Sequence, residues 1–126
     1  MLGGVIAVGV GAAVGAWMRW GLSMVLNPRV PHFPLGTLAA NLIGGYLVGF
    51  AVAYFAARHD LAPELRLFAI TGFLGGLTTF STFSAEVTDL LLRGEYLNAG
   101  SLALVHLAGS IVLTIAGIAS FRALGA

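Results

Sequence analysis

Four long apolar segments run through the chain, and short polar or proline-rich connections separate them. A helix needs about 20 largely apolar residues to cross a bilayer, and each segment reaches that length. The connection 27–34 holds three prolines, which end helices. The sequence therefore predicts an all-α integral membrane protein with one four-helix domain over residues 1–126. The expected spans are residues 2–26, 35–57, 65–92 and 97–122.

Composition excludes several classes of protein. Hydrophobic residues make up 59% of the chain and charged residues only 9%, whereas soluble domains carry about 25% charge. The absence of cysteine excludes disulfides and thiolate metal sites. A net charge of +1 argues against a nucleic-acid partner. No nucleophile with its base, phosphate loop or dinucleotide fingerprint is recognisable, so we do not expect an enzyme.

Glycines spaced four residues apart recur in three of the predicted spans. Helices in lipid associate through close backbone approach, which small residues permit. For most of these glycines, tight helix packing is a sufficient explanation. The pairs are Gly11 with Gly15, Gly45 with Gly49, and Gly72 with Gly76.

The third span carries an unusual polar stretch at residues 72–86. As a helix, residues 65–92 would be roughly 42 Å long, with their centre near Thr78 and beside Gly75 and Gly76. The glycine pair, followed by hydroxyls, predicts a helix broken at its centre. Unwound backbone at bilayer depth is tolerated only where protein buries it or where it lines a polar pathway. We therefore expect the chain to move a small polar species.

Two phenylalanines in this stretch, Phe80 and Phe83, are three residues apart and share a helical face. They either fill apolar space, as membrane phenylalanines usually do, or present their positive ring edges to a small anion. Hydroxyl donors interleave with the rings, and bonds back to the preceding turn account for some of them. These hydroxyls belong to Thr79, Ser81, Thr82 and Ser84.

Polar residues elsewhere in the spans each have two interpretations. Asn41 either joins helices or lines a pathway, and Glu86 either pairs at the interface or acts on ions. Arg19 lies between two tryptophans. It either reaches the headgroups or concentrates anions in a vestibule. His106 and Ser110 share a face of the fourth span, where a lone histidine is more often a packed polar residue than a ligand.

The arginines are balanced between the two ends of the spans. Three on each side leave the positive-inside rule without a bias, although so small a count can balance by chance. A chain without bias can insert in both directions and form an antiparallel homodimer, like an inverted repeat made from two copies. One end holds Arg58, Arg66 and Arg122, and the other holds Arg19, Arg29 and Arg93.

The stretch 72–86, with Gly-Gly-Leu-Thr-Thr-Phe-Ser-Thr-Phe at its centre, resembles the signature of the Fluc/CrcB family of fluoride channels. Segments 15–20 and 36–45 support the resemblance, which extends over the whole chain. It implies a dual-topology homodimer in the plasma (inner) membrane, with two fluoride pores and passive fluoride export that confers fluoride resistance. It also implies a structural sodium ion at the dimer interface.

The resemblance also assigns roles to single residues. Phe80 and Phe83 resemble the ring-edge fluoride pair, and Asn41 resembles the pore asparagine. The fourth span departs from the family pattern, in which some members carry a tyrosine and serines on the pore-facing side. Here that face holds Leu102, His106 and Ser110, and only Ser110 keeps a hydroxyl. The remaining matches are Thr79, Ser81 and Thr82 in a hydroxyl track, Glu86 beyond it, Arg19 in the vestibule, and the carbonyls of Gly75 and Thr78 at sodium.

Two other functions fit a small four-span protein. A proton-coupled small multidrug-type transporter needs a titratable acid deep in the membrane, but the first span has none and Glu86 lies off the midplane. A non-transporting helical partner would explain the glycines but not the hydroxyls beside a break.

Overall fold

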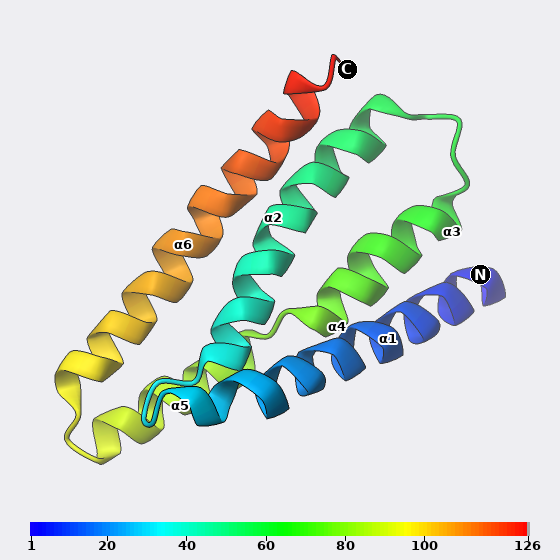
Figure 1. Ribbon diagram of the computed structural model, residues 1–126. Helices are drawn as coiled ribbons and strands as arrows, with labels where there is room; N and C mark the ends of the chain where they lie inside the picture. Colours follow the sequence, from blue (N-terminus) through cyan, green and yellow to red (C-terminus); the bar gives the residue numbers. More distant parts are fainter. Residues whose placement is uncertain (126) are drawn as a thin grey trace.

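The computed structural model describes residues 1–125 and is all-helical, with four helices long and apolar enough to cross a membrane. The first, second and fourth spans are single helices, as expected. The third span consists of four helical pieces (Figure 1). The elements are α1 (Leu2–Leu26), the short η1 (Asn27–Arg29), α2 (Leu35–Ala57), α3 (Pro63–Arg66), the π-helical η2 (Leu67–Leu74), α4 (Gly75–Leu77), α5 (Phe80–Leu92) and α6 (Tyr96–Ala123).

The third span is broken, but not at the glycine pair that the sequence singled out. Thr78 and Thr79 are both extended, with φ/ψ of −91°/156° and −155°/123°, whereas Gly75 and Gly76 lie in helical α4. A Cβ on Gly76 would lie 2.4 Å from the carbonyl oxygen of Ala12 in α1. Gly76 therefore serves helix packing, and the break begins two residues later.

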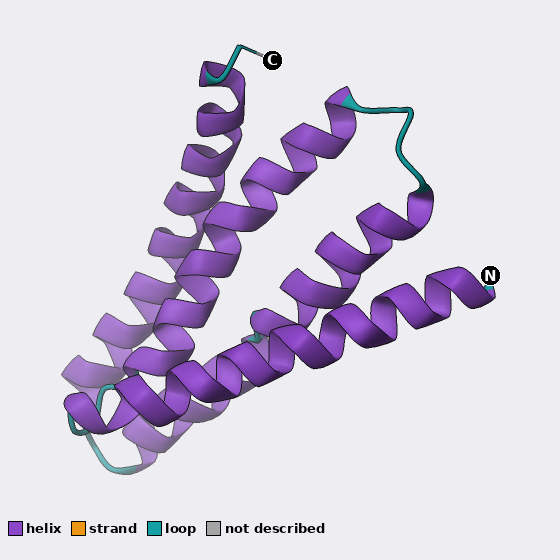
Figure 2. Ribbon diagram, turned by 45° about the vertical axis from the view of Figure 1, so that its right-hand side comes forward, coloured by secondary structure: helices purple, strands orange, loops and turns teal. Residues whose placement is uncertain are grey.

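Close glycine contacts join the helices into two pairs. A Cβ on Gly15 of α1 would lie 2.1 Å from the Phe73 oxygen of η2. On α2, a Cβ on Gly49 would lie 2.0 Å from the Thr114 oxygen of α6. The prediction of tight packing at spaced glycines is confirmed. The pair of α1 with the first half of the third span and the pair of α2 with α6 diverge from each other (Figures 1 and 2).

The divergence leaves little common core. A cluster of Ala40, Leu74 and Leu77 is buried where the two pairs meet, and Leu90 is buried beside Ala99 under the link between α5 and α6. The short link makes α5 and α6 neighbours at that end, but the main partner of α6 is α2. The four helices therefore do not surround one shared core.

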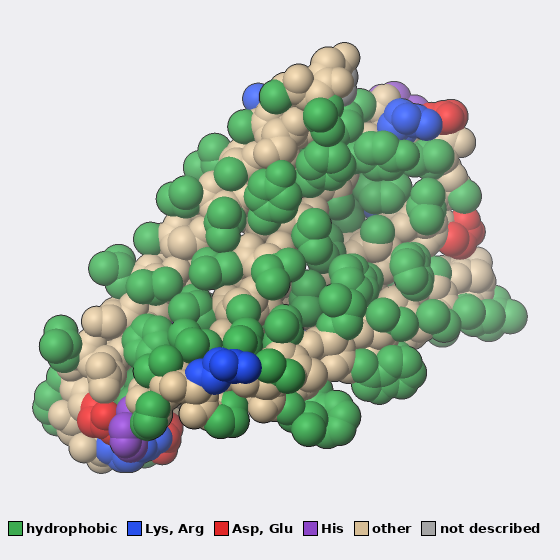
Figure 3. Space-filling model, viewed as in Figure 1, with side chains coloured by type: hydrophobic (Ala, Val, Ile, Leu, Met, Phe, Trp, Pro, Cys, Tyr) green, Lys and Arg blue, Asp and Glu red, His purple; other side chains and the backbone are tan. Residues whose placement is uncertain are grey.

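The face shown in Figure 3 is mostly apolar, with charged groups gathered toward its two ends and a basic side chain among the apolar ones between them. At the end near the α5–α6 link, Arg93 contacts Asp89 and lies 3.5 Å from Glu95, whose carboxylate is 3.4 Å from His32. The hydrogen bond with Asp89 raises the pKa of Arg93, so this arginine stays charged. Large apolar side chains along α6, such as Leu104 and Ile115, are exposed, as lipid-facing residues are.

The substitution Gly49→Ala should separate α2 from α6, because its methyl group would overlap the backbone of Thr114. Overpacking of this kind costs about 1–3 kcal/mol, so we expect a lower thermal unfolding midpoint in detergent. Gly100→Ala is the control, since no atom lies within 4 Å of its Cβ position. A Gly49→Ala protein as stable as Gly100→Ala would contradict the packing role.

Candidate functional site

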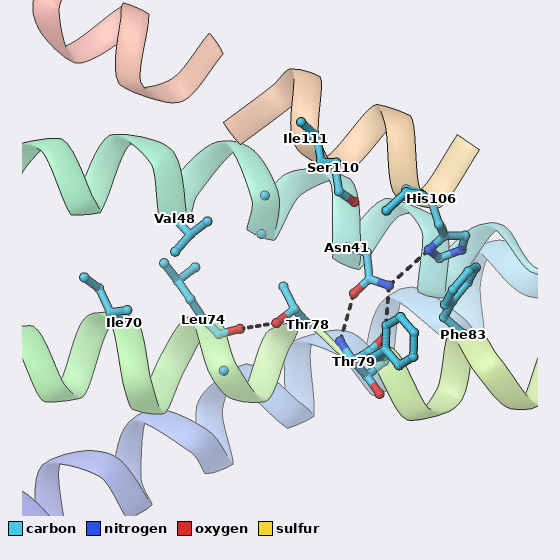
Figure 4. A pocket seen from close by; sticks show the side chains of 15 residues that line it. Asn41, Val48, Ile70, Leu74, Thr78, Thr79, Phe83, His106, Ser110 and Ile111 are labelled. Carbon is cyan, nitrogen blue, oxygen red and sulfur yellow. Dashed lines mark hydrogen bonds between the residues drawn. The ribbon is translucent and has the colours of Figure 1, made fainter. Parts of the chain in front are cut away.

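A cavity of about 430 Å³ opens where the helix pairs diverge, beside the break in the third span. Its polar groups gather at the Thr78–Thr79 end, and aliphatic side chains line the other end (Figure 4). It brings together seven of the predicted site residues. These are Asn41, Gly75, Thr78, Thr79, Phe80, Phe83 and Ser110.

The side-chain amide of Asn41 on α2 holds the break open. Its Oδ1 accepts from the backbone N–H of Thr79 at 2.8 Å, and its Nδ2 donates to the Thr79 carbonyl at 3.0 Å. In a continuous helix that N–H would bond to the Gly75 carbonyl four residues back. Asn41 thus satisfies backbone groups that neither lipid nor water would satisfy at this depth.

His106 on α6 completes this polar cluster. Its Nδ1 lies 3.1 Å from Nδ2 of Asn41, and its side chain is buried, with 3% of the residue exposed. The imidazole packs on Phe83 with 4.4 Å between ring centroids. The sequence left His106 without a role, and the structure places it in direct contact with two predicted site residues.

The phenylalanine pair faces the cavity from the first turn of α5. The ring centroids of Phe80 and Phe83 are 5.4 Å apart and the rings are inclined by 65°, which directs a ring edge toward a neighbouring face. Phe83 is half-buried, but Phe80 is 77% exposed although it lines the cavity. This chain alone therefore covers only part of the cavity wall.

The hydroxyls form a cap at the start of α5. The Oγ1 of Thr79 accepts the backbone N–H of Thr82 at 3.1 Å and lies 3.1 Å from the Ser81 hydroxyl and 3.3 Å from the Thr82 hydroxyl. Ser81 and Thr82 thus lie beside the cavity and connect to it through Thr79. Capping accounts for one of their bonds and leaves hydroxyl groups to serve a solute.

Glu86 lies away from this cavity, next to a second one of about 300 Å³. Its Oε2 accepts from the buried Thr37 hydroxyl at 2.6 Å, and its Oε1 is buried without a partner in the described chain. Thr37 is a partner of Glu86 that the sequence reasoning did not single out. Its signal was its position one turn before Asn41 on the same face of α2.

Arg19 approaches the break from α1. Its Nε donates to the carbonyl of Gly76 at 3.1 Å, and the side chain is half-buried. The arginine therefore neutralises one of the carbonyls that lose their helical donors at the break. The two interpretations of Arg19 from the sequence, contact with headgroups and a position in a vestibule, did not predict this bond to the backbone.

Two further carbonyls lose their usual partners. The N–H groups of Thr79 and Thr82, which would bond to Gly75 and Thr78 in a helix, donate to side chains instead. Backbone carbonyls are ligands for a hard cation such as sodium, so these residues fit the expected ion. Among residues 1–125 no cluster of three histidine or acidic side chains could hold a metal.

Replacing Asn41 by leucine should destabilise the fold, because both backbone groups of Thr79 would lose their partner. An unsatisfied buried polar group costs about 1–3 kcal/mol, so the unfolding midpoint in detergent should fall clearly. Ser110→Ala is the matched control from the same cavity. Equal midpoints for Asn41→Leu and Ser110→Ala would show that Asn41 does not maintain the break.

Comparisons with known proteins agree on one family. Residues 6–118 match the family described as CrcB-like protein, Camphor Resistance (CrcB). A relative from Nitrosospira multiformis, named fluoride-specific ion channel FluC, is 61% identical over 92% of this chain and 91% of its own length. Relatives of the same name from Thiobacillus denitrificans and Pseudomonas putida are each 59% identical, over 93% and 96% of this chain and 94% and 95% of their own lengths. The resemblance noted in the sequence is therefore confirmed over nearly the full length, and the chain belongs to the CrcB-like family of FluC proteins.

Proposed function

We propose that this chain is a fluoride-specific ion channel, a multi-pass protein of the bacterial plasma membrane that releases fluoride passively and so confers fluoride resistance. The relatives named fluoride-specific ion channel are about 60% identical over nearly the whole chain. The observation that carries the proposal is the cavity at the helix break, where amide and hydroxyl groups lie beside two phenylalanine rings.

The cavity suits a small anion. Fluoride gains more than larger halides from close N–H and O–H donors, and ring edges add attraction without a formal charge that would hold the ion. Conduction requires binding that is favourable but easily reversed. We place the pathway along Asn41, Phe80 and Phe83, with further groups on either side. These are Thr79, Ser81, Thr82, Ser110 and Glu86, to which we add Thr37.

The incomplete cavity supports an antiparallel homodimer with two pores. Phe80 lines the cavity and is nevertheless 77% exposed, which leaves one side of the cavity open to a partner. A second copy in the opposite orientation would cover that side in both chains at once. The balanced arginines allow both orientations, since neither end of the spans carries the excess of basic residues that would keep it on the cytoplasmic side.

The same dimer provides a site for sodium. The Gly75 and Thr78 carbonyls lie at the break, and their helical donors are engaged elsewhere. Two carbonyls from each copy would meet at a two-fold axis and surround one monovalent cation. A cation there would neutralise the carbonyl dipoles and hold the two breaks together.

Arg19 serves the vestibule in this proposal. Its Nε is bonded to Gly76, which leaves its terminal nitrogens to attract anions toward the pore. The rival function, a proton-coupled small multidrug-type transporter, lacks its essential group. No acidic residue lies in α1, and Glu86 is bonded to Thr37 away from the main cavity.

Liposomes holding the purified protein should release fluoride rapidly and retain chloride, as measured with ion-selective electrodes. Phe80→Ile and Phe83→Ile should each reduce fluoride release at least about tenfold, because a branched alkyl group offers no ring edge to the ion. Phe68→Ile is the control, since Phe68 lies on η2 outside the cavity lining. Absence of fluoride release from folded wild-type protein would refute the channel function itself.

Dual topology is tested by labelling the link between α2 and α3. The chain has no cysteine, so His59→Cys places a single thiol there without changing the arginine balance. In intact cells, an impermeant maleimide should label about half of the protein, and the remainder only after permeabilisation, because unbiased chains insert both ways. Ile115→Cys, on a lipid-facing part of α6, should stay unlabelled. Labelling entirely from one side would exclude the antiparallel dimer.

A further inference from the structure

The amide hydrogens of Asn41 are both engaged within the protein. The backbone N–H of Thr79 requires an acceptor and its carbonyl requires a donor, so the two contacts determine which amide atom is oxygen and which is nitrogen. One hydrogen of Nδ2 goes to the Thr79 carbonyl, and the other points to Nδ1 of His106. In this arrangement Asn41 has no N–H left for a solute.

This orientation of Asn41 also selects the tautomer of His106. Because Nδ2 of Asn41 donates, Nδ1 of His106 must accept, and a neutral imidazole that accepts at Nδ1 carries its proton on Nε2. A charged imidazolium would set an N–H group against another N–H group. The buried ring is therefore an uncharged donor with a fixed orientation.

The Nε2 donor of His106 has no partner. It is fully shielded from solvent, and no hydrogen-bond acceptor reaches it from the described chain. The two nitrogens of an imidazole diverge, so Nε2 points away from Asn41. A buried N–H without a partner costs free energy, so its presence calls for an explanation. It belongs to a residue that lines the cavity and packs on the Phe83 ring (Figure 4).

We propose that the Nε2–H group of His106 donates directly to fluoride as the ion passes Phe83. This assignment rests on the proposed channel function and deepens it. It makes His106 an N–H donor for the ion, and it makes Asn41 the residue that orients His106 and supports the break. Because Nε2 is covered in this structure, the ion can reach the donor only after a neighbouring side chain moves, and Phe83 packs directly on the imidazole.

The donor has properties that conduction requires. An uncharged N–H group binds fluoride less tightly than an arginine or lysine would, so the ion can leave. The imidazole is held by Asn41 on one side and Phe83 on the other, so little side-chain entropy is lost when the ion arrives. A leucine at this position would fill similar space without a donor.

Fluoride efflux from liposomes separates the donor from the ring. His106→Gln keeps a side-chain N–H that can reach the Nε2 position, with its oxygen available to Asn41, and should retain most of the flux. His106→Leu removes the donor and should reduce fluoride flux at least about tenfold. Leu102→Met, buried one turn earlier on α6 and outside the cavity lining, is the packing control.

The two proposals fail differently in this experiment. Wild-type liposomes that hold fluoride would refute the channel function, whereas conducting wild-type liposomes with equal flux through folded His106→Leu would refute only the histidine assignment. Loss of flux in both the Gln and Leu variants would also overturn it, because the ring and not the donor would then matter.

Nitrogen-15 NMR of labelled histidine tests the assignment without relying on any variant's activity. His106, identified by the signal missing in His106→Gln, should show a protonated Nε2 and an unprotonated Nδ1. Its Nε2 signal should shift when fluoride is added and stay unchanged with chloride. A proton on Nδ1, or an Nε2 signal indifferent to fluoride, would overturn the proposal.

Discussion

The bidentate contact between the Asn41 side chain and the Thr79 backbone is the interaction on which the site depends. A transmembrane helix can be interrupted only if the freed N–H and C=O groups find other partners. Asn41 provides both partners for Thr79, at 2.8 and 3.0 Å. The same contact releases the Gly75 carbonyl from its helical donor and directs the last amide hydrogen to His106. One side chain thus shapes the break, the carbonyl ligands and the donor arrangement.

The glycine contacts provide the frame in which this interaction forms. Backbones at Gly15 and Gly49 approach their partners so closely that no Cβ could be accommodated, which joins α1 to the third span and α2 to α6. The two pairs diverge and leave the cavity between them. A single compact bundle would have filled this space with side chains. In the proposed dimer, a second copy would cover the exposed Phe80 and complete this frame.

Most of the architecture could be predicted from the chain alone. Hydropathy and prolines indicated the four apolar helices, and the hydroxyl-rich stretch indicated an interruption in the third. The position of the interruption was predicted at Gly75 and Gly76 and is at Thr78 and Thr79. Glycine is a sign both of unwinding and of close packing, and only the presence of Ala12 against Gly76 distinguishes the two.

Properties that act locally can be recognised in the chain alone: apolar length, helix-ending prolines, spaced glycines and the motif of the CrcB-like family. The pairing of polar groups distant in sequence could not be recognised there. Asn41 contacts both Thr79 and His106, Thr37 bonds to Glu86, and Arg19 reaches Gly76. The physical reason is that a buried polar group is satisfied by whichever partner the packed backbones bring within reach, and that proximity is set by contacts between helices.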